Sequence, residues 1–124
     1  MTERKKHILV IEDDESVRNL LLHALSLTYE VEAISDGNTA FRRVQSEPVA
    51  DLMICDVMLP GVDGWAIARR AKTSKWAQVP IIFLTAKTTP RDVIQGIQSG
   101  ARHYVTKPFK LKDLLDKVKK IVGA

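Results

Sequence analysis

Cysteine is nearly absent from this chain: its 124 residues include only one, so no disulfide can form within it. Cys55 falls inside an apolar run, where we expect a small buried residue rather than a reactive thiol. Long apolar runs are missing too, and residues 1–6 lead into a strand without the apolar segment of a secretion signal. These features predict a cytoplasmic protein with no membrane contact.

Aromatic residues are scarce, at 6%, and none interleaves with the lysines that crowd the last helix. The net charge of +4 could suggest a nucleic-acid partner, but base stacking needs aromatic rings beside the lysines. We therefore interpret the lysines as a solvated helix face and expect no direct nucleic-acid binding. Apolar residues at 45% and charged residues at 27% are ordinary for a globular protein, and the length fits one domain, residues 1–124.

Four short apolar runs each end in polar residues. Such runs are typical of strands buried on both faces, as in a parallel sheet covered by helices. The runs and the residues that follow or end them are Ile8–Ile11 with Glu12 and Asp13, Leu52–Cys55 with Asp56, Ile81–Leu84 with Thr85, and His103–Thr106 with Lys107. Because the carboxyl ends of parallel strands meet at one edge, we expect these polar residues to form a single site.

Apolar residues at helical spacing separate the runs. They predict helices at about residues 15–27, after an N-cap at Asp36, after Gly64, before Gly100 and near the end of the sequence, where apolar residues between Leu111 and Val122 share one face. A short strand at 31–34 is expected near a sheet edge. Strand and helix thus alternate five times, which predicts an α/β fold: a doubly wound, flavodoxin-like three-layer sandwich with five parallel strands in the order 2-1-3-4-5.

The expected site is strongly acidic. Glu12, Asp13 and Asp56 repel one another unless positive charge is shared among them, and Lys107 supplies one such charge. Carboxylates, a backbone carbonyl and waters are the ligands that Mg²⁺ prefers, with Mn²⁺ also acceptable. An aspartate on such an ion can accept a phosphoryl group, and Asp56 is the best candidate. The Thr85 hydroxyl and the Lys107 ammonium would then stabilise the transferred group.

Together these motifs resemble the receiver domain of two-component response regulators. The matching segments are residues 11–14, 51–64, 83–86 and 100–109, and the likeness spans nearly the whole chain. The resemblance implies that Asp56 accepts a phosphoryl group from the phosphohistidine of a sensor histidine kinase or phosphotransfer protein. It also implies that Asp13 contacts the metal directly, that Glu12 does so chiefly through water, and that Met58 offers its backbone carbonyl.

The same resemblance implies a switch. Thr85 would move toward the phosphoryl group and Tyr104 would turn inward behind it, changing the surface made by the fourth helix, fifth strand and fifth helix. A downstream protein or output domain would read that surface. The Lys107-Pro108 bond would be cis, which aims the ammonium inward. Spacing alone favours an ordinary half-buried strand residue at Tyr104, and the resemblance favours the switch.

Other interpretations remain open at this stage. The chain could be an interaction module that keeps the fold without being phosphorylated. A Mg²⁺-dependent aspartyl phosphatase would want a second aspartate two residues after Asp56, where Met58 stands. A receiver would catalyse only its own phosphorylation and hydrolysis and would not be a metabolic enzyme. Asp14 is either a third metal ligand or a residue that favours the dipole of the first helix.

Overall fold

The computed structural model describes residues 5–86, 94 and 103–123. Its five strands form one parallel sheet in the order β2-β1-β3-β4-β5, so the expected fold and strand order are confirmed. The strands are β1 (His7–Ile11), β2 (Glu30–Ile34), β3 (Leu52–Asp56), β4 (Ile81–Thr85) and β5 (His103–Thr106). As expected, the short strand β2 lies at an edge of the sheet.

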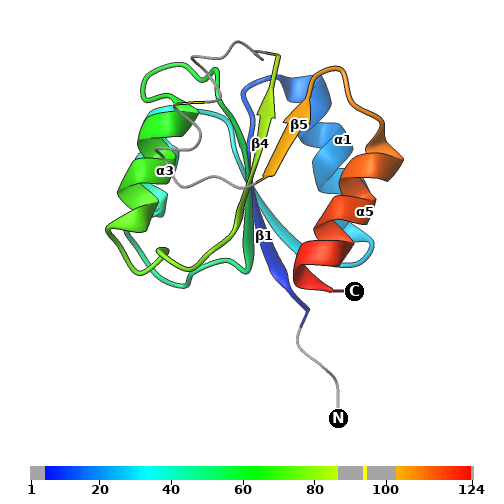
Figure 1. Cartoon of the computed structure of the whole chain (residues 1–124), viewed down its shortest axis with the longest axis horizontal. Helices are drawn as coiled ribbons and strands as arrows, with labels where there is room; N and C mark the ends of the chain where they lie inside the picture. The colour runs from blue at the N-terminus through cyan, green and yellow to red at the C-terminus, as the bar shows by residue number, and fades with distance from the viewer. Residues whose placement is uncertain (1–4, 87–93, 95–102, 124) are drawn as a thin grey trace.

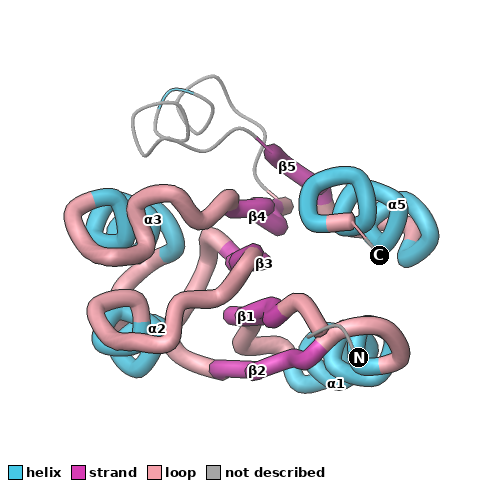
Figure 2. Tube along the Cα trace, turned by 90° about the horizontal axis from the view of Figure 1, so that it is seen from below, coloured by secondary structure: helices cyan, strands magenta, loops and turns pink. Residues whose placement is uncertain are grey.

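Helices cover both faces of this sheet. One face carries α2 (Gly37–Arg43) and α3 (Gly64–Lys72), and the other carries α1 (Glu15–Ser26) and α5 (Leu111–Val122), as Figures 1 and 2 show. Of the helix expected before Gly100, the structure describes only Ile94, and the rest lies outside the described residues. Within the described part of the chain, no helix has the length and apolar character needed to cross a membrane.

Two apolar clusters fill the spaces between the sheet and the helices. Successive strand residues point to opposite faces, so Leu9 and Met53 pack toward α2 and α3, while Ile8 and Leu52 pack toward α1 and α5. This explains why β1, β3 and β4 are apolar along most of their length and buried almost completely. The expectation of full burial was wrong for β5, whose residues are half-buried or exposed, because β5 is the last strand at its edge.

Aspartates cap three of the helices at the edge where the strands end. Each carboxylate accepts a hydrogen bond from the backbone N–H three residues later: Asp14 from Val17 at 3.0 Å, Asp36 from Thr39 at 2.8 Å and Asp63 from Ala66 at 2.9 Å. The N-cap expected at Asp36 is therefore confirmed. Asp14 acts as the cap of α1, which agrees with the helix interpretation rather than with ligation.

An ion pair secures the outer strand β2 to the neighbouring helix. Arg43 of α2 donates from Nε to Glu32 Oε2 at 2.9 Å, and its guanidinium lies 4.9 Å from the centre of the buried Trp76 ring. Arg43 also donates to the carbonyl of Pro48 at 2.6 Å, in the connection that leads to β3. The arginine thus ties an edge strand, a helix and a loop together.

Candidate functional site

The sheet register brings the expected site residues to one edge. Ile11 of β1 pairs with Cys55, and Asp56 of β3 pairs with Leu84 of β4. Glu12 and Thr85, the next residues on the neighbouring strands, therefore flank Asp56. All three side chains are buried, with exposed fractions of 0% for Glu12, 3% for Thr85 and 5% for Asp56.

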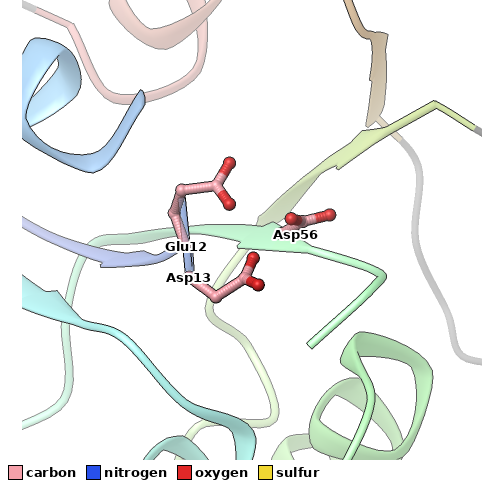
Figure 3. Close-up of side chains that lie close together, drawn as sticks. All are labelled: Glu12, Asp13 and Asp56. Atoms are coloured by element: carbon pink, nitrogen blue, oxygen red, sulfur yellow. The ribbon is translucent and has the colours of Figure 1, made fainter. Parts of the chain in front are cut away.

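Three carboxylates converge at this edge. One oxygen from each of Glu12, Asp13 and Asp56 lies within 4.8 Å of the others, and the side chains face a common space (Figure 3). Glu12 and Asp56 are buried, whereas Asp13 is exposed. An all-oxygen donor set that opens to solvent on one side fits a hard divalent cation that keeps some of its water, such as Mg²⁺.

Lys107 joins the acidic group from the end of β5. Its Nζ donates to Glu12 Oε1 at 2.5 Å and to Asp56 Oδ2 at 3.1 Å. Its backbone N–H donates to the carbonyl of Thr85 at 2.9 Å, and the Lys107–Pro108 peptide bond is cis. Burial disfavours the ammonium, but the two carboxylate contacts outweigh burial and raise the pKa of Lys107, so the side chain is charged at neutral pH.

Glu12 is the most confined of the acids. Its Oε2 accepts the N–H of Asp14 at 3.2 Å, while Oε1 accepts from Lys107, so the protein engages both oxygens. Burial raises the pKa of Glu12 from 4.5 to about 7, with the hydrogen bond to Asp56 adding to the rise and Lys107 opposing it. The ammonium of Lys107 therefore does not fully offset the burial of Glu12 and the nearby carboxylate of Asp56.

The loop after β3 holds Asp56 from its other side. The backbone N–H of Met58 donates to Asp56 Oδ1 at 3.1 Å, and the Met58 side chain is 52% exposed beside it. Gly64 closes the loop by donating to the carbonyl of Val57 at 2.9 Å. A Cβ at Gly64 would lie 2.5 Å from the carbonyl oxygen of Asp56, so glycine permits this close approach.

Tyr104 lies against an aromatic cluster that the sequence did not reveal. Its ring stacks on Phe83 with centroids 6.0 Å apart and meets the edge of Trp65 at 6.4 Å. The Tyr104 hydroxyl is buried and has no hydrogen-bond partner among the described residues. Burial raises the pKa of this hydroxyl above its usual value, so it remains neutral.

Besides the aromatic cluster around Tyr104, the sequence analysis missed Arg18, which contacts the backbone of the acidic pair. It lies in the first turns of α1, and its Nη1 donates to the backbone carbonyls of Glu12 at 3.1 Å and Asp13 at 3.2 Å. Its position four residues after the N-cap is a usable signal, because helical side chains lean toward the N-terminus of their helix. Periodicity alone marks it only as a polar residue of an amphipathic helix.

The sheet order, with these carboxylates and a lysine at its carboxyl edge, defines a receiver-type α/β domain. The family model of the response regulator receiver domain matches residues 8–119, and the chain belongs to this family. It is therefore a receiver domain of two-component signal transduction.

Two curated relatives illustrate the likeness in sequence. The transcriptional regulatory protein RprY of Bacteroides fragilis is 37% identical over 97% of this chain and 50% of its own length. The alkaline phosphatase synthesis transcriptional regulatory protein PhoP of Bacillus subtilis is 38% identical over 94% of this chain and 48% of its own length. The chain thus spans about half the length of the curated relatives it matches.

Solved structures agree with the fold. The BeF3-activated receiver domain of DrrB superposes with a TM-score of 0.86 at 28% identity, covering 97% of this chain and 99% of that one. The receiver domain of the sensor histidine kinase PA1611 from Pseudomonas aeruginosa, with a magnesium ion coordinated in its active-site cleft, superposes with a TM-score of 0.82 at 30% identity and the same coverages.

Proposed function

We propose that Asp56 is the phosphoacceptor of this receiver domain. The observation that carries the proposal is the position of its carboxylate, 3.1 Å from the Lys107 ammonium and grouped with the carboxylates of Glu12 and Asp13. The donor is the phosphohistidine of a sensor histidine kinase or phosphotransfer protein. Residues 1–124 act as one receiver unit in the cytoplasm, and this unit makes no direct contact with nucleic acid.

The chain's own groups account for the transfer. Asp56 is held by the N–H of Met58, and its oxygen forms the new O–P bond as the N–P bond of the donor histidine breaks. The Lys107 ammonium and the Thr85 hydroxyl stabilise the oxygens of the transferred group. Glu12, Asp13, Asp56 and the carbonyl of Met58 would hold Mg²⁺ or Mn²⁺, which supplies positive charge against the phosphoryl oxygens. Catalysis is confined to the domain's own phosphorylation and hydrolysis.

Thr85 and Tyr104 form the switch in this proposal. Thr85 ends β4 beside Asp56, and Tyr104 packs one strand farther along the sheet with an unpartnered hydroxyl among the described residues. A phosphoryl group that draws Thr85 toward Asp56 changes the space into which the Tyr104 ring fits. The signal then reaches a downstream protein or output domain through β5, α5 and the fourth helix. Most of the fourth helix lies outside the described residues.

The relatives support an output domain as the partner. RprY and PhoP are described as transcriptional regulators, and each is about twice as long as the part that matches this chain. Nucleic-acid recognition would then belong to such an output domain, while the receiver controls it.

Incubation with acetyl phosphate, with and without Mg²⁺, tests the proposal. We expect intact-mass measurement to show one phosphoryl group added only when Mg²⁺ is present, because crowded carboxylates otherwise repel the donor. Asp56→Asn is the matched control, since it keeps the shape and removes the nucleophile. An unmodified wild-type protein would favour an interaction module that is never phosphorylated, and an adduct on Asp56→Asn would place the acceptor elsewhere.

A further inference from the structure

Arg18 lies beside the acidic pair without contacting its carboxylates. Its Nη1 donates to two consecutive backbone carbonyls, those of Glu12 at 3.1 Å and Asp13 at 3.2 Å. The side chain is half-buried, and it reaches back from α1 over the start of its own helix. One cationic group therefore fastens both peptide units from which the two acidic side chains extend.

The contacts around the connection between β1 and α1 fix Glu12 more fully than Asp13. The Glu12 N–H donates to the carbonyl of Ile34 at 3.0 Å, and the Asp14 N–H donates to Glu12 Oε2 at 3.2 Å. These bonds hold Glu12 on both sides. Asp13 is exposed, and the bond from Arg18 to its carbonyl is a side-chain contact that restrains its backbone.

We propose that Arg18 is a positioning residue for the divalent cation: by holding the carbonyls of Glu12 and Asp13, it keeps their carboxylates converged with that of Asp56. This inference rests on the proposed function of the acidic site. Arg18 does not touch the phosphoryl group or the cation, and it acts through the backbone of the two acids. Groups that orient metal ligands in this way commonly change metal affinity by about 10-fold or more when they are removed.

Charge and position have opposite effects here, so they can be separated. The guanidinium is itself positive and repels a nearby divalent cation, so its loss would strengthen Mg²⁺ binding if charge alone mattered. The loss of both carbonyl bonds frees the backbone of the acidic pair and would weaken binding. The sign of the change in dissociation constant therefore identifies which effect dominates.

The experiment is a calorimetric titration of the full chain with MgCl₂ at neutral pH. We expect the dissociation constant for Mg²⁺ to rise by about 10-fold in Arg18→Met. Arg69→Met is the matched control, because Arg69 is exposed on α3, and it should leave the constant unchanged. Circular dichroism at the same temperature confirms that each variant is folded.

Arg18→Lys keeps the charge but replaces the planar donor with a shorter ammonium that does not span both carbonyls as well. We expect its Mg²⁺ affinity to lie between those of wild type and Arg18→Met, which also covers the case in which Arg18→Met does not fold. Urea unfolding without Mg²⁺ provides the second readout. A purely structural role lowers the urea midpoint and leaves the Mg²⁺ dissociation constant of the folded protein unchanged.

Tighter or unchanged Mg²⁺ binding in both arginine variants would overturn the inference. If the wild type binds Mg²⁺ and gains a phosphoryl group on Asp56, that result would leave the proposed function intact. A wild-type protein that binds no Mg²⁺ would instead overturn the proposed function, and the role of Arg18 with it.

Discussion

At the scale of single residues, Glu12 makes the stability of the metal-free protein depend on pH. Its pKa is about 7 in the folded state and 4.5 in the reference state, mainly because it is buried. Between these values the folded protein binds more protons than the unfolded chain, so the contribution of Glu12 to stability falls as the pH rises. We expect Glu12→Gln to remove this part of the slope.

Urea unfolding in EDTA at several pH values between 4.5 and 7 measures the effect. The relevant quantity is the difference between wild type and Glu12→Gln, because the other carboxylates titrate in both proteins. Equal slopes in the two proteins would show that Glu12 keeps an ordinary pKa in the folded state.

Tyr104 and Tyr29 offer a second residue-scale comparison, because their hydroxyls are in opposite situations. The Tyr104 hydroxyl is buried and unpartnered among the described residues, whereas the Tyr29 hydroxyl donates to the carbonyl of Gly123 at 2.9 Å. We expect Tyr104→Phe to raise the free energy of unfolding by about 1 kcal/mol and Tyr29→Phe to lower it by about 1 kcal/mol. Destabilisation by Tyr104→Phe would mean that the hydroxyl has a partner in solution.

Part of the site could be predicted from the sequence because strand ends fix its residues. Asp56, Thr85 and Lys107 each follow an apolar run, and parallel pairing brings such positions to one edge whatever the details of packing. The stacking of Tyr104 depends on neighbours distant in sequence, which no local pattern encodes. The contacts of Arg18 are local, but they depend on its side-chain rotamer, which its position after the N-cap suggests without fixing.

At the scale of elements, the start of α2 packs tightly against the loop that follows Asp56. A Cβ at Gly37 would lie 1.7 Å from the carbonyl oxygen of Val62, and the Gly37 N–H donates to the carbonyl of Pro60 at 3.1 Å. In a helix, alanine normally stabilises the folded state by about 1 kcal/mol relative to glycine. Here we expect Gly37→Ala to lower the free energy of unfolding by about 2 kcal/mol, because the helix and loop must separate.

Chemical denaturation compares this variant with Gly123→Ala. At Gly123 a Cβ would meet nothing within 4 Å, although its φ of 81° disfavours alanine. That control isolates backbone strain from crowding. A Gly37→Ala protein as stable as wild type would show that α2 and the loop can move apart at little cost.

Helix and strand positions were predicted well where apolar periodicity was strong. α5 covers the expected apolar positions from Leu111 to Val122, and Val31–Ile34 forms part of β2. The burial of β5 was not predicted correctly, because an apolar run does not show whether its strand is central or at an edge.

At the scale of the whole molecule, one sheet serves two apolar clusters. Trp65 and Trp76 both belong to the cluster on the side of α2 and α3, while helices on both sides contribute to the circular dichroism signal. Because β1, β3 and β4 contribute to both clusters, neither layer should persist without the other. We expect tryptophan fluorescence and far-ultraviolet circular dichroism to give the same urea midpoint, as in two-state unfolding. Separate midpoints would show that the two layers unfold independently.

The ion pair on β2 has a consequence for the behaviour of the protein at high concentration. An outermost strand exposes backbone groups that could join a strand of another molecule. Here such a neighbour would have to lie against the carboxylates of Glu30 and Glu32, and Glu32 is kept in place by Arg43. Dehydrating these charges is unfavourable, so this border of the sheet discourages fibril growth and helps the molecules remain separate.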